Sequence, residues 1–186
     1  MGGGHVGMSR RAGNLSLHGR LSLTSLRPDG TVRDGRSGDN IMCTGGLSVL
    51  ASALVWSGMQ DQAASQGVTQ PTYLTPLWGA VGSGSGTVAA SDTLLFNELG
   101  RQIVGAGASS PATSTIPAEV TWLFYFPSPA STWTVTEAGI FANGSSSAAS
   151  VTTAGTMIDH WAFSPTITVP ASDTLILQAT FSIAGT

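Results

Sequence analysis

Two glutamates, Glu98 and Glu137, are the side chains of this chain that could support catalysis. Carboxylate pairs serve as acid and as base or nucleophile in glycoside hydrolases. Arg101, however, follows Glu98 by three residues and is the only lysine or arginine after residue 36. A carboxylate that folding buries needs such a partner. We therefore predict a structural ion-pair cluster of Glu98, Arg101 and Glu137, with a hydrolase that uses the two glutamates as the lesser alternative.

Other catalytic patterns fail on residue type or spacing. The chain has no lysine, so the glycine-serine stretch 82–86 cannot be a phosphate loop, and its GSGSG order does not match a nucleophile elbow. Cys43 lies in the apolar run NIMCTGGL, which predicts a buried, inert thiol. We predict no enzymatic activity and no cofactor.

The three histidines, His5, His18 and His160, are scattered along the chain. Asp159 and His160 are neighbours in a predicted strand, so their side chains should point to opposite faces and form no pair. No two histidines or cysteines stand at the spacing of zinc ligands. No metal site is predicted.

Alternating apolar residues define the first and last strands. Leucines alternate with polar residues over 15–23, and apolar residues alternate in the same way over 175–183. An irregularity is expected near Thr24, then a turn at 27–30, a short returning strand at 31–33 and a polar loop at 34–40. Leucine, alanine and valine at helical spacing predict a helix at about 46–57, capped by Thr44.

The sequence predicts mainly strands in the middle of the chain. They are expected at 74–81, 102–106, 120–126, 132–141 and 156–163, the last extended by 166–169. A short helix at 91–99 would bring Glu98 and Arg101 onto neighbouring turns. Many strands at regular spacing with one amphipathic helix predict an antiparallel β-sandwich or jelly roll.

Composition favours a protein that packs in an assembly. The 186 residues fit one domain, or one domain with an arm, and 41% of them are hydrophobic. Only 9% are charged, against about 25% in ordinary soluble domains. We find no apolar run of the length of a membrane span and no apolar signal-peptide core, so no membrane association is expected.

Charge divides the chain near residue 36. Residues 1–36 hold six arginines and two aspartates, a net charge of +4, whereas 37–186 hold one arginine and eight acids, a net charge of −7. We therefore divide the chain into a basic N-terminal arm with the first strands, 1–36, and a sandwich body, 37–186. The arm should bind an acidic partner, and a neighbouring protein subunit is favoured over nucleic acid because no aromatic residues interleave with the arginines. The assembly arginines are Arg10, Arg11, Arg20, Arg27, Arg33 and Arg36.

Five motifs in order resemble a pattern in bacteriophage structural proteins. They are WGAVGSGSG, SDTLLFNELGRQ, VTEAGIFAN, a strand with methionine and phenylalanine six residues apart, and DTLILQATFSI. Over about 73–183 the series resembles the attachment domain of tail-collar fibre proteins and related small virion proteins. Leu95, Glu98 and Arg101 match its turn, and Glu137 with residues 139–141 matches its EAGIF strand. No fibre shaft or receptor-binding tip follows in this sequence, and the basic start departs from the pattern.

The resemblance implies a non-enzymatic virion protein: a capsid decoration (cement) protein or a tail, collar or fibre component. It would act in the virion, after assembly in the bacterial cytoplasm, as a homo-oligomer, with a trimer favoured. Other capsid or tail proteins would be its partners, with a host surface glycan as a further one. The alternative is a surface carbohydrate- or receptor-binding module, which exposed Trp78 or Trp161 would favour.

Overall fold

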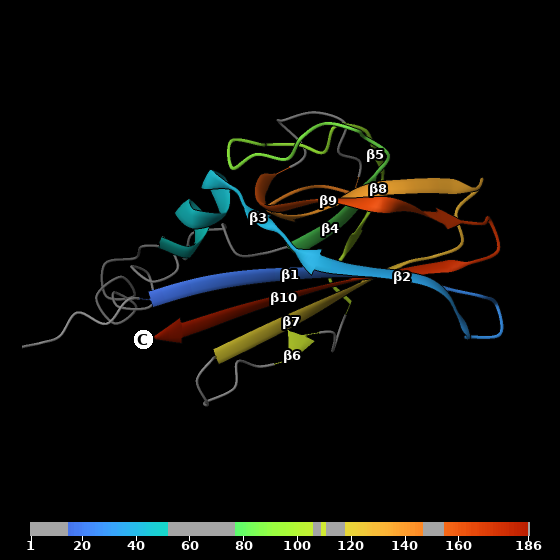
Figure 1. Cartoon of the computed structure of the whole chain (residues 1–186), viewed down its shortest axis with the longest axis horizontal. Helices are drawn as coiled ribbons and strands as arrows, with labels where there is room; N and C mark the ends of the chain where they lie inside the picture. Colours follow the sequence, from blue (N-terminus) through green and yellow to red (C-terminus); the bar gives the residue numbers. More distant parts are fainter. Residues whose placement is uncertain (1–14, 52–76, 106–108, 111–117, 147–154, 186) are drawn as a thin grey trace, which may run out of the picture.

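A computed structural model describes residues 15–51, 77–105, 109–110, 118–146 and 155–185. These residues form ten β-strands and one short helix, arranged as two stacked layers (Figure 1). The strands are β1 Leu15–Leu26, β2 Val32–Asp39, β3 Ile41–Met42, β4 Leu77–Gly82, β5 Glu98–Ile103, β6 Ser109–Ser110, β7 Ala118–Phe126, β8 Trp133–Ala142, β9 Thr156–Val169 and β10 Thr174–Gly185.

The strands form two five-stranded antiparallel sheets. The first sheet has the order β2-β1-β10-β7-β6, and the second has the order β3-β9-β8-β4-β5. Within the first sheet, β1 pairs with β10 from Leu15↔Gly185 to Leu26↔Thr174, so the two strands with the clearest alternation lie side by side. The predicted antiparallel β-sandwich is confirmed, and the narrower jelly-roll topology stays a prediction.

The main hydrophobic core lies between the two sheets. Leu21, Leu23, Phe124, Ile140 and Leu177 are among its fully buried members. Gly79 allows β4 to approach the first sheet, because a Cβ atom there would lie 2.5 Å from the Phe124 ring. Adding a methyl group at this position would therefore force the packed layers apart.

A second, smaller cluster packs on the outer face of the second sheet. It contains Cys43, Ala80, Leu95, Phe141 and Met157. Leu95 belongs to the segment 83–97, called here the covering loop, which lies over this face. The second sheet is thus packed on both faces, as the buried residues of β4 and β8 indicate.

The amphipathic helix begins earlier than predicted. It covers 44–51 among the described residues, and its expected end near residue 57 lies outside them. Val49 packs into the main core, whereas Leu47 is exposed. In Figure 1 the helix lies at the end of the sandwich where β1 begins and β10 ends.

Two local predictions were wrong. The polar stretch 34–40 is not a loop, because β2 runs through it and pairs with β1 from Leu26↔Val32 to Arg20↔Asp39. Residues 91–99 do not form a helix, because the covering loop runs directly into β5 at Glu98. In both places cross-strand hydrogen bonding with another strand outweighs the weak local pattern.

Candidate functional site

The predicted ion pair between Glu98 and Arg101 is present, in a different local structure. Arg101 Nε and one terminal nitrogen each donate a hydrogen bond of 2.7 Å to the Glu98 carboxylate. Val81 pairs with Gly100 and Gly82 pairs with Glu98, so Leu99 is an extra residue in β5. This β-bulge places both side chains on one face, where regular alternation would separate residues three apart.

The pair is held firmly in place. The Arg101 side chain is 1% exposed, and its guanidinium carbon lies 4.7 Å from the centre of the Phe141 ring. A cation over an aromatic face and a bidentate carboxylate are both favourable environments for arginine. Arg101 therefore links the edge strand β5 to β8 on the outer face of the second sheet.

Among the described residues, the hydrogen bonds of Glu137 are made with groups other than Arg101, which differs from the predicted cluster. Its Oε1 accepts hydrogen bonds from the backbone amides of Gly84 (2.8 Å) and Asn97 (2.9 Å). Its Oε2 accepts one from the amide of Phe96 (3.0 Å) and lies 3.0 Å from His160 Nε2. The partners are amides of the covering loop because Glu137, on β8, points to the face that this loop crosses.

His160 links this carboxylate to a second one. Its Nδ1 lies 2.7 Å from Asp92 Oδ2, and Asp92 in turn accepts a hydrogen bond from the amide of Ala89. Both ring nitrogens of the buried His160 thus lie within hydrogen-bond distance of carboxylate oxygens. The result is a Glu137–His160–Asp92 network that joins β8, β9 and the covering loop.

The hydrogen bonds decide the ionisation of Glu137. Burial by itself would raise its pKa, but the bonds from His160 and from the Asn97, Phe96 and Gly84 amides outweigh burial and leave the pKa below its ordinary value. The carboxylate is charged and all its acceptor positions point at protein donors. A glycosidase needs a carboxyl group that is free to reach substrate, and this one is fully buried.

Asp159 precedes His160 on β9, and its pKa is shifted in the opposite direction to that of Glu137. It is fully buried, and neither of its carboxylate oxygens has a hydrogen-bond partner among the described residues. Burial raises its pKa to about 8. As predicted, it forms no side-chain pair with His160, because successive residues of β9 point to opposite faces.

The loop geometry depends on small residues beside Glu137. A Cβ atom on Gly84 would lie 2.5 Å from Glu137 Oε1 and 2.3 Å from the Cβ of Phe96. The hydroxyl of Thr136 donates to the Gly84 carbonyl, and the Ser83 amide donates to the Asn97 carbonyl. The glycine-serine stretch therefore closes one end of the covering loop onto β8.

The structure describes four of the six assembly arginines. Arg10 and Arg11 fall outside the described residues, whereas the other four belong to β1, β2 and the turn between them. The boundary drawn at residue 36 falls inside β2, and β1 contributes Leu21 and Leu23 to the core. Residues 15–36 are thus part of the sandwich, so an arm separate from the sheet could comprise residues 1–14 at most.

All four described arginines make contacts within the fold, and Arg20 donates a hydrogen bond to Ser37. Arg33 donates to the buried Asp173 carboxylate, and this hydrogen bond lowers the pKa of Asp173. Arg27 donates to Thr31 Oγ1 and to the Val32 carbonyl across the turn. Arg36 pairs with Asp34. These side chains stabilise the β1–β2 hairpin and its contact with the β9–β10 turn.

The tryptophans and Cys43 were each predicted to be mainly buried, and the structure gives the burial of those it describes. Trp161 is 6% exposed and packs in the main core, and Trp78 is partly buried, so neither forms the exposed platform that would favour sugar binding. Trp122 and Trp133 pack against the core as predicted, and Trp56 lies outside the described residues. Cys43 is fully buried, and burial raises its pKa to about 12, which confirms the buried-thiol prediction.

The described residues contain no cluster of three or more histidine, cysteine or acidic side chains suited to a metal ion. Among these same residues, no helix is long and apolar enough to cross a membrane. No protein-family model, curated protein or solved structure matches the chain. The resemblance to phage attachment domains therefore rests on the sequence motifs themselves.

Proposed function

We propose that this chain is a non-enzymatic bacteriophage virion structural protein, either a capsid decoration (cement) protein or a tail, collar or fibre component. It self-associates, with a trimer favoured, and attaches to other virion proteins through its N-terminal residues. The two glutamates have structural roles in this proposal: Glu98 holds Arg101, and Glu137 holds the covering loop.

The observation that carries the proposal is an exposed hydrophobic side chain on three strands at sheet edges. Val32 on β2 is 60% exposed, Ile41 on β3 is 36% exposed and Ile103 on β5 is 47% exposed. Charges on an edge strand hinder its pairing with other chains, and β2 carries four of them: Arg33, Asp34, Arg36 and Asp39. The exposed hydrophobic side chains favour contact with further subunits through side chains at these edges.

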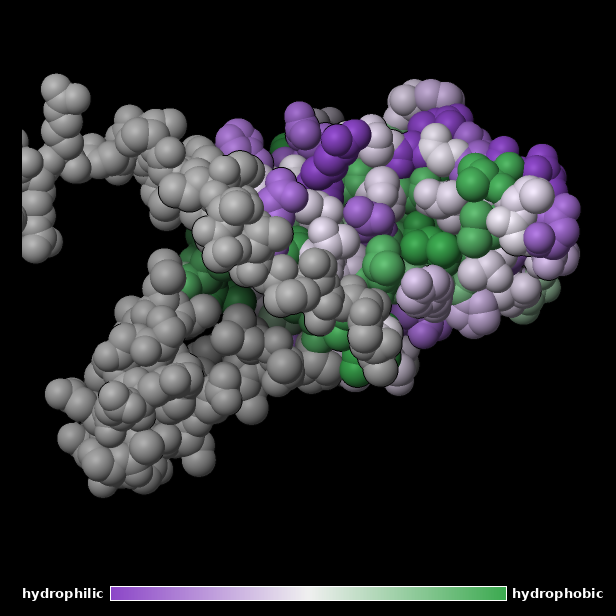
Figure 2. All heavy atoms as spheres, turned by 90° about the horizontal axis from the view of Figure 1, so that it is seen from below, coloured by the Kyte–Doolittle hydropathy of each residue, from purple (hydrophilic) through white to green (hydrophobic). Residues whose placement is uncertain are grey.

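The low charge of the sequence agrees with this interpretation. In Figure 2, hydrophobic residues lie among hydrophilic ones over the described part of the surface. Charged residues make up only 9% of the sequence. Proteins that remain monomeric at high concentration usually have more charge to keep copies apart.

Light scattering with mass determination tests the assembly part of the proposal. We expect the full chain to form trimers or larger species, and the variant Val32→Lys with Ile103→Lys to shift toward monomers. Leu47→Lys on the helix is the matched control, because Leu47 is 53% exposed but lies on no sheet edge. A monomeric full chain at high concentration would contradict self-association.

Two further measurements separate attachment from self-association. A version that lacks residues 1–14 should keep its oligomeric mass if the body supplies the subunit contacts, and it should bind purified virion components less well. The deletion stops at residue 14 because β1 pairs with β10 from residue 15 onward. Peptides of this chain should be found in purified particles of the phage that encodes it, and their absence would exclude a virion role.

A further inference from the structure

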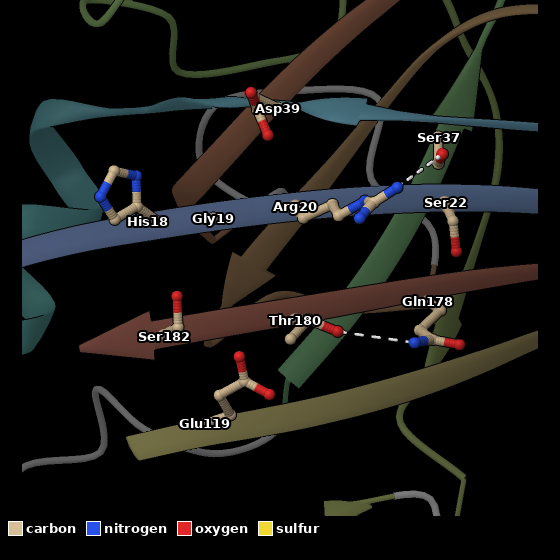
Figure 3. A pocket seen from close by; sticks show the side chains of 10 residues that line it. All are labelled: His18, Gly19, Arg20, Ser22, Ser37, Asp39, Glu119, Gln178, Thr180 and Ser182. Carbon is tan, nitrogen blue, oxygen red and sulfur yellow. Dashed lines mark hydrogen bonds between the residues drawn. The ribbon is translucent and has the colours of Figure 1, made fainter. Parts of the chain in front are cut away.

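The outer face of the first sheet contains a hollow of about 600 Å³. Its lining comes from four adjacent strands, β2, β1, β10 and β7, and Figure 3 shows the side chains standing on this face. The volume falls within the range of ligand-binding pockets, about 300–1,000 Å³. We call this region the polar hollow.

Strand register arranges the polar hollow in rows across the sheet. Arg20 lies opposite Asp39 on one side and Thr180 on the other. In the row before it, Ser182 lies between His18 and Glu119. Given about 3.3 Å per residue and about 4.8 Å between strands, the lined area measures roughly 13 Å along β1 and roughly 14 Å from β2 to β7.

Part of the lining is fixed by contacts within the protein. Arg20 donates a hydrogen bond of 3.1 Å to the Ser37 hydroxyl, and Thr180 shares one of 3.0 Å with Thr121. These contacts hold the central side chains in place, and the Arg20–Ser37 bond is drawn in Figure 3. The remaining donors of the Arg20 guanidinium stay available to a ligand.

Two carboxylates beside the polar hollow have no side-chain partner within the described residues. Within the described part of the chain, neither the Asp39 nor the Glu119 carboxylate takes part in a hydrogen bond or ion pair, although Arg20 lies directly opposite Asp39 in the sheet. Figure 3 shows these carboxylates on opposite sides of the hollow. They supply acceptors on both flanks, while the guanidinium and the serine hydroxyls supply donors between them.

The chemistry of the lining selects the class of ligand. Among the described residues that line the hollow there is no large hydrophobic side chain, which does not suit a protein interface, whose buried centre is apolar. Two carboxylates against one guanidinium disfavour anionic ligands such as nucleic acid. Sugar hydroxyls both donate and accept, so they can pair with carboxylates and guanidinium together.

We propose that the polar hollow binds a neutral oligosaccharide of several units, with Asp39 and Glu119 accepting from its hydroxyls and Arg20 donating to them. Binding occurs without cleavage. The two carboxylates stand on strands roughly 14 Å apart, whereas glycosidase pairs lie about 5–9.5 Å apart. This site goes beyond the proposed assembly function and does not depend on it.

A printed glycan array that carries neutral and anionic oligosaccharides tests the ligand class, followed by calorimetric titration of the strongest neutral oligosaccharide. We expect binding to neutral glycans of three or more units. Asp39→Asn and Glu119→Gln should each weaken binding about tenfold, because each loses a charge-assisted hydrogen bond while keeping its shape. Asp29→Asn is the matched control, since Asp29 lies in the β1–β2 turn and does not line the hollow.

Several results would overturn the inference. An array without neutral glycan binding, or one with anionic glycans only, would exclude the ligand class. Unchanged affinity in Asp39→Asn and Glu119→Gln would place the site elsewhere. Release of new reducing ends would contradict binding without cleavage, and a changed oligomeric mass in either variant would make the hollow a subunit contact. If the chain were monomeric and still bound glycans, the self-association proposal would be contradicted and the glycan-binding proposal would stand.

Discussion

On the outer face of the second sheet, the covering loop buries Glu137 and His160, whereas the outer face of the first sheet leaves Glu119 and Asp39 open to solvent. Both faces belong to five-stranded antiparallel sheets of one sandwich. On the covered face every oxygen of Glu137 has a protein donor. On the open face the two carboxylates have none within the described residues.

The difference shows how the same kind of side chain serves two purposes. A buried carboxylate that is fully hydrogen bonded can hold a loop in one conformation, and it is costly to remove. An exposed carboxylate contributes little to stability and keeps its acceptors for a ligand. We therefore expect stability to depend on the covered face and ligand binding to depend on the open face.

The largest expected effect comes from Glu137→Gln, set against Glu119→Gln. The first variant leaves His160 and a backbone amide without a proper acceptor and should lower the free energy of unfolding by about 3–5 kcal/mol. The second should change it by less than about 0.5 kcal/mol. Chemical denaturation of both variants measures the contrast, and equal losses would show that the covered network has no special role.

Arg101→Ala should have the next largest effect, a loss of about 2–4 kcal/mol in the free energy of unfolding. The substitution removes the bidentate pair with Glu98 and the contact with Phe141. Arg36→Ala is the control, because it also removes an arginine–carboxylate pair, here with Asp34, but one that is partly exposed and worth about 0–1 kcal/mol. An unchanged melting temperature in Arg101→Ala would refute the structural role of this pair.

A smaller effect with a distinct pH dependence is expected for Asp159→Asn. The pKa of Asp159 is raised to about 8 in the folded protein, so the folded state holds this proton more tightly than the unfolded state. The contribution of Asp159 to stability is therefore greatest below about pH 4 and falls as the pH rises toward 8. Asp159→Asn should stabilise the protein by more than about 1 kcal/mol at pH 8 and by much less near pH 4.

The contribution of Glu137 to stability changes with pH in the opposite direction to that of Asp159. Its pKa is lowered in the folded state, so its contribution is present above about pH 4.3 and is lost as the pH falls through the folded pKa. Denaturation curves from pH 3 to pH 9 on the natural chain and on Asp159→Asn separate the two groups. A pH-independent difference between the two proteins would contradict the buried, unpartnered state of Asp159.

Local patterns predicted the sheets better than they predicted the site. Strict alternation over 15–23 and 175–183 identified β1 and β10, since a period of two is a property of the strand itself. The pair of Glu98 with Arg101 was also predicted, but through a helix that does not form. Asp92 was not identified at all, because nothing near it in the sequence indicates that His160 lies 68 residues away in the same network.

The sequence by itself determined the fold class, the buried thiol of Cys43 and the structural use of Arg101, because each follows from nearby residues or from composition. Tertiary structure decided the rest. The β-bulge at Leu99 exists only because β5 pairs with β4, and Glu137 receives its amide donors only because the covering loop crosses β8. The polar hollow likewise depends on the register of four strands that are distant in sequence, and cross-strand register is a long-range property that no single stretch encodes.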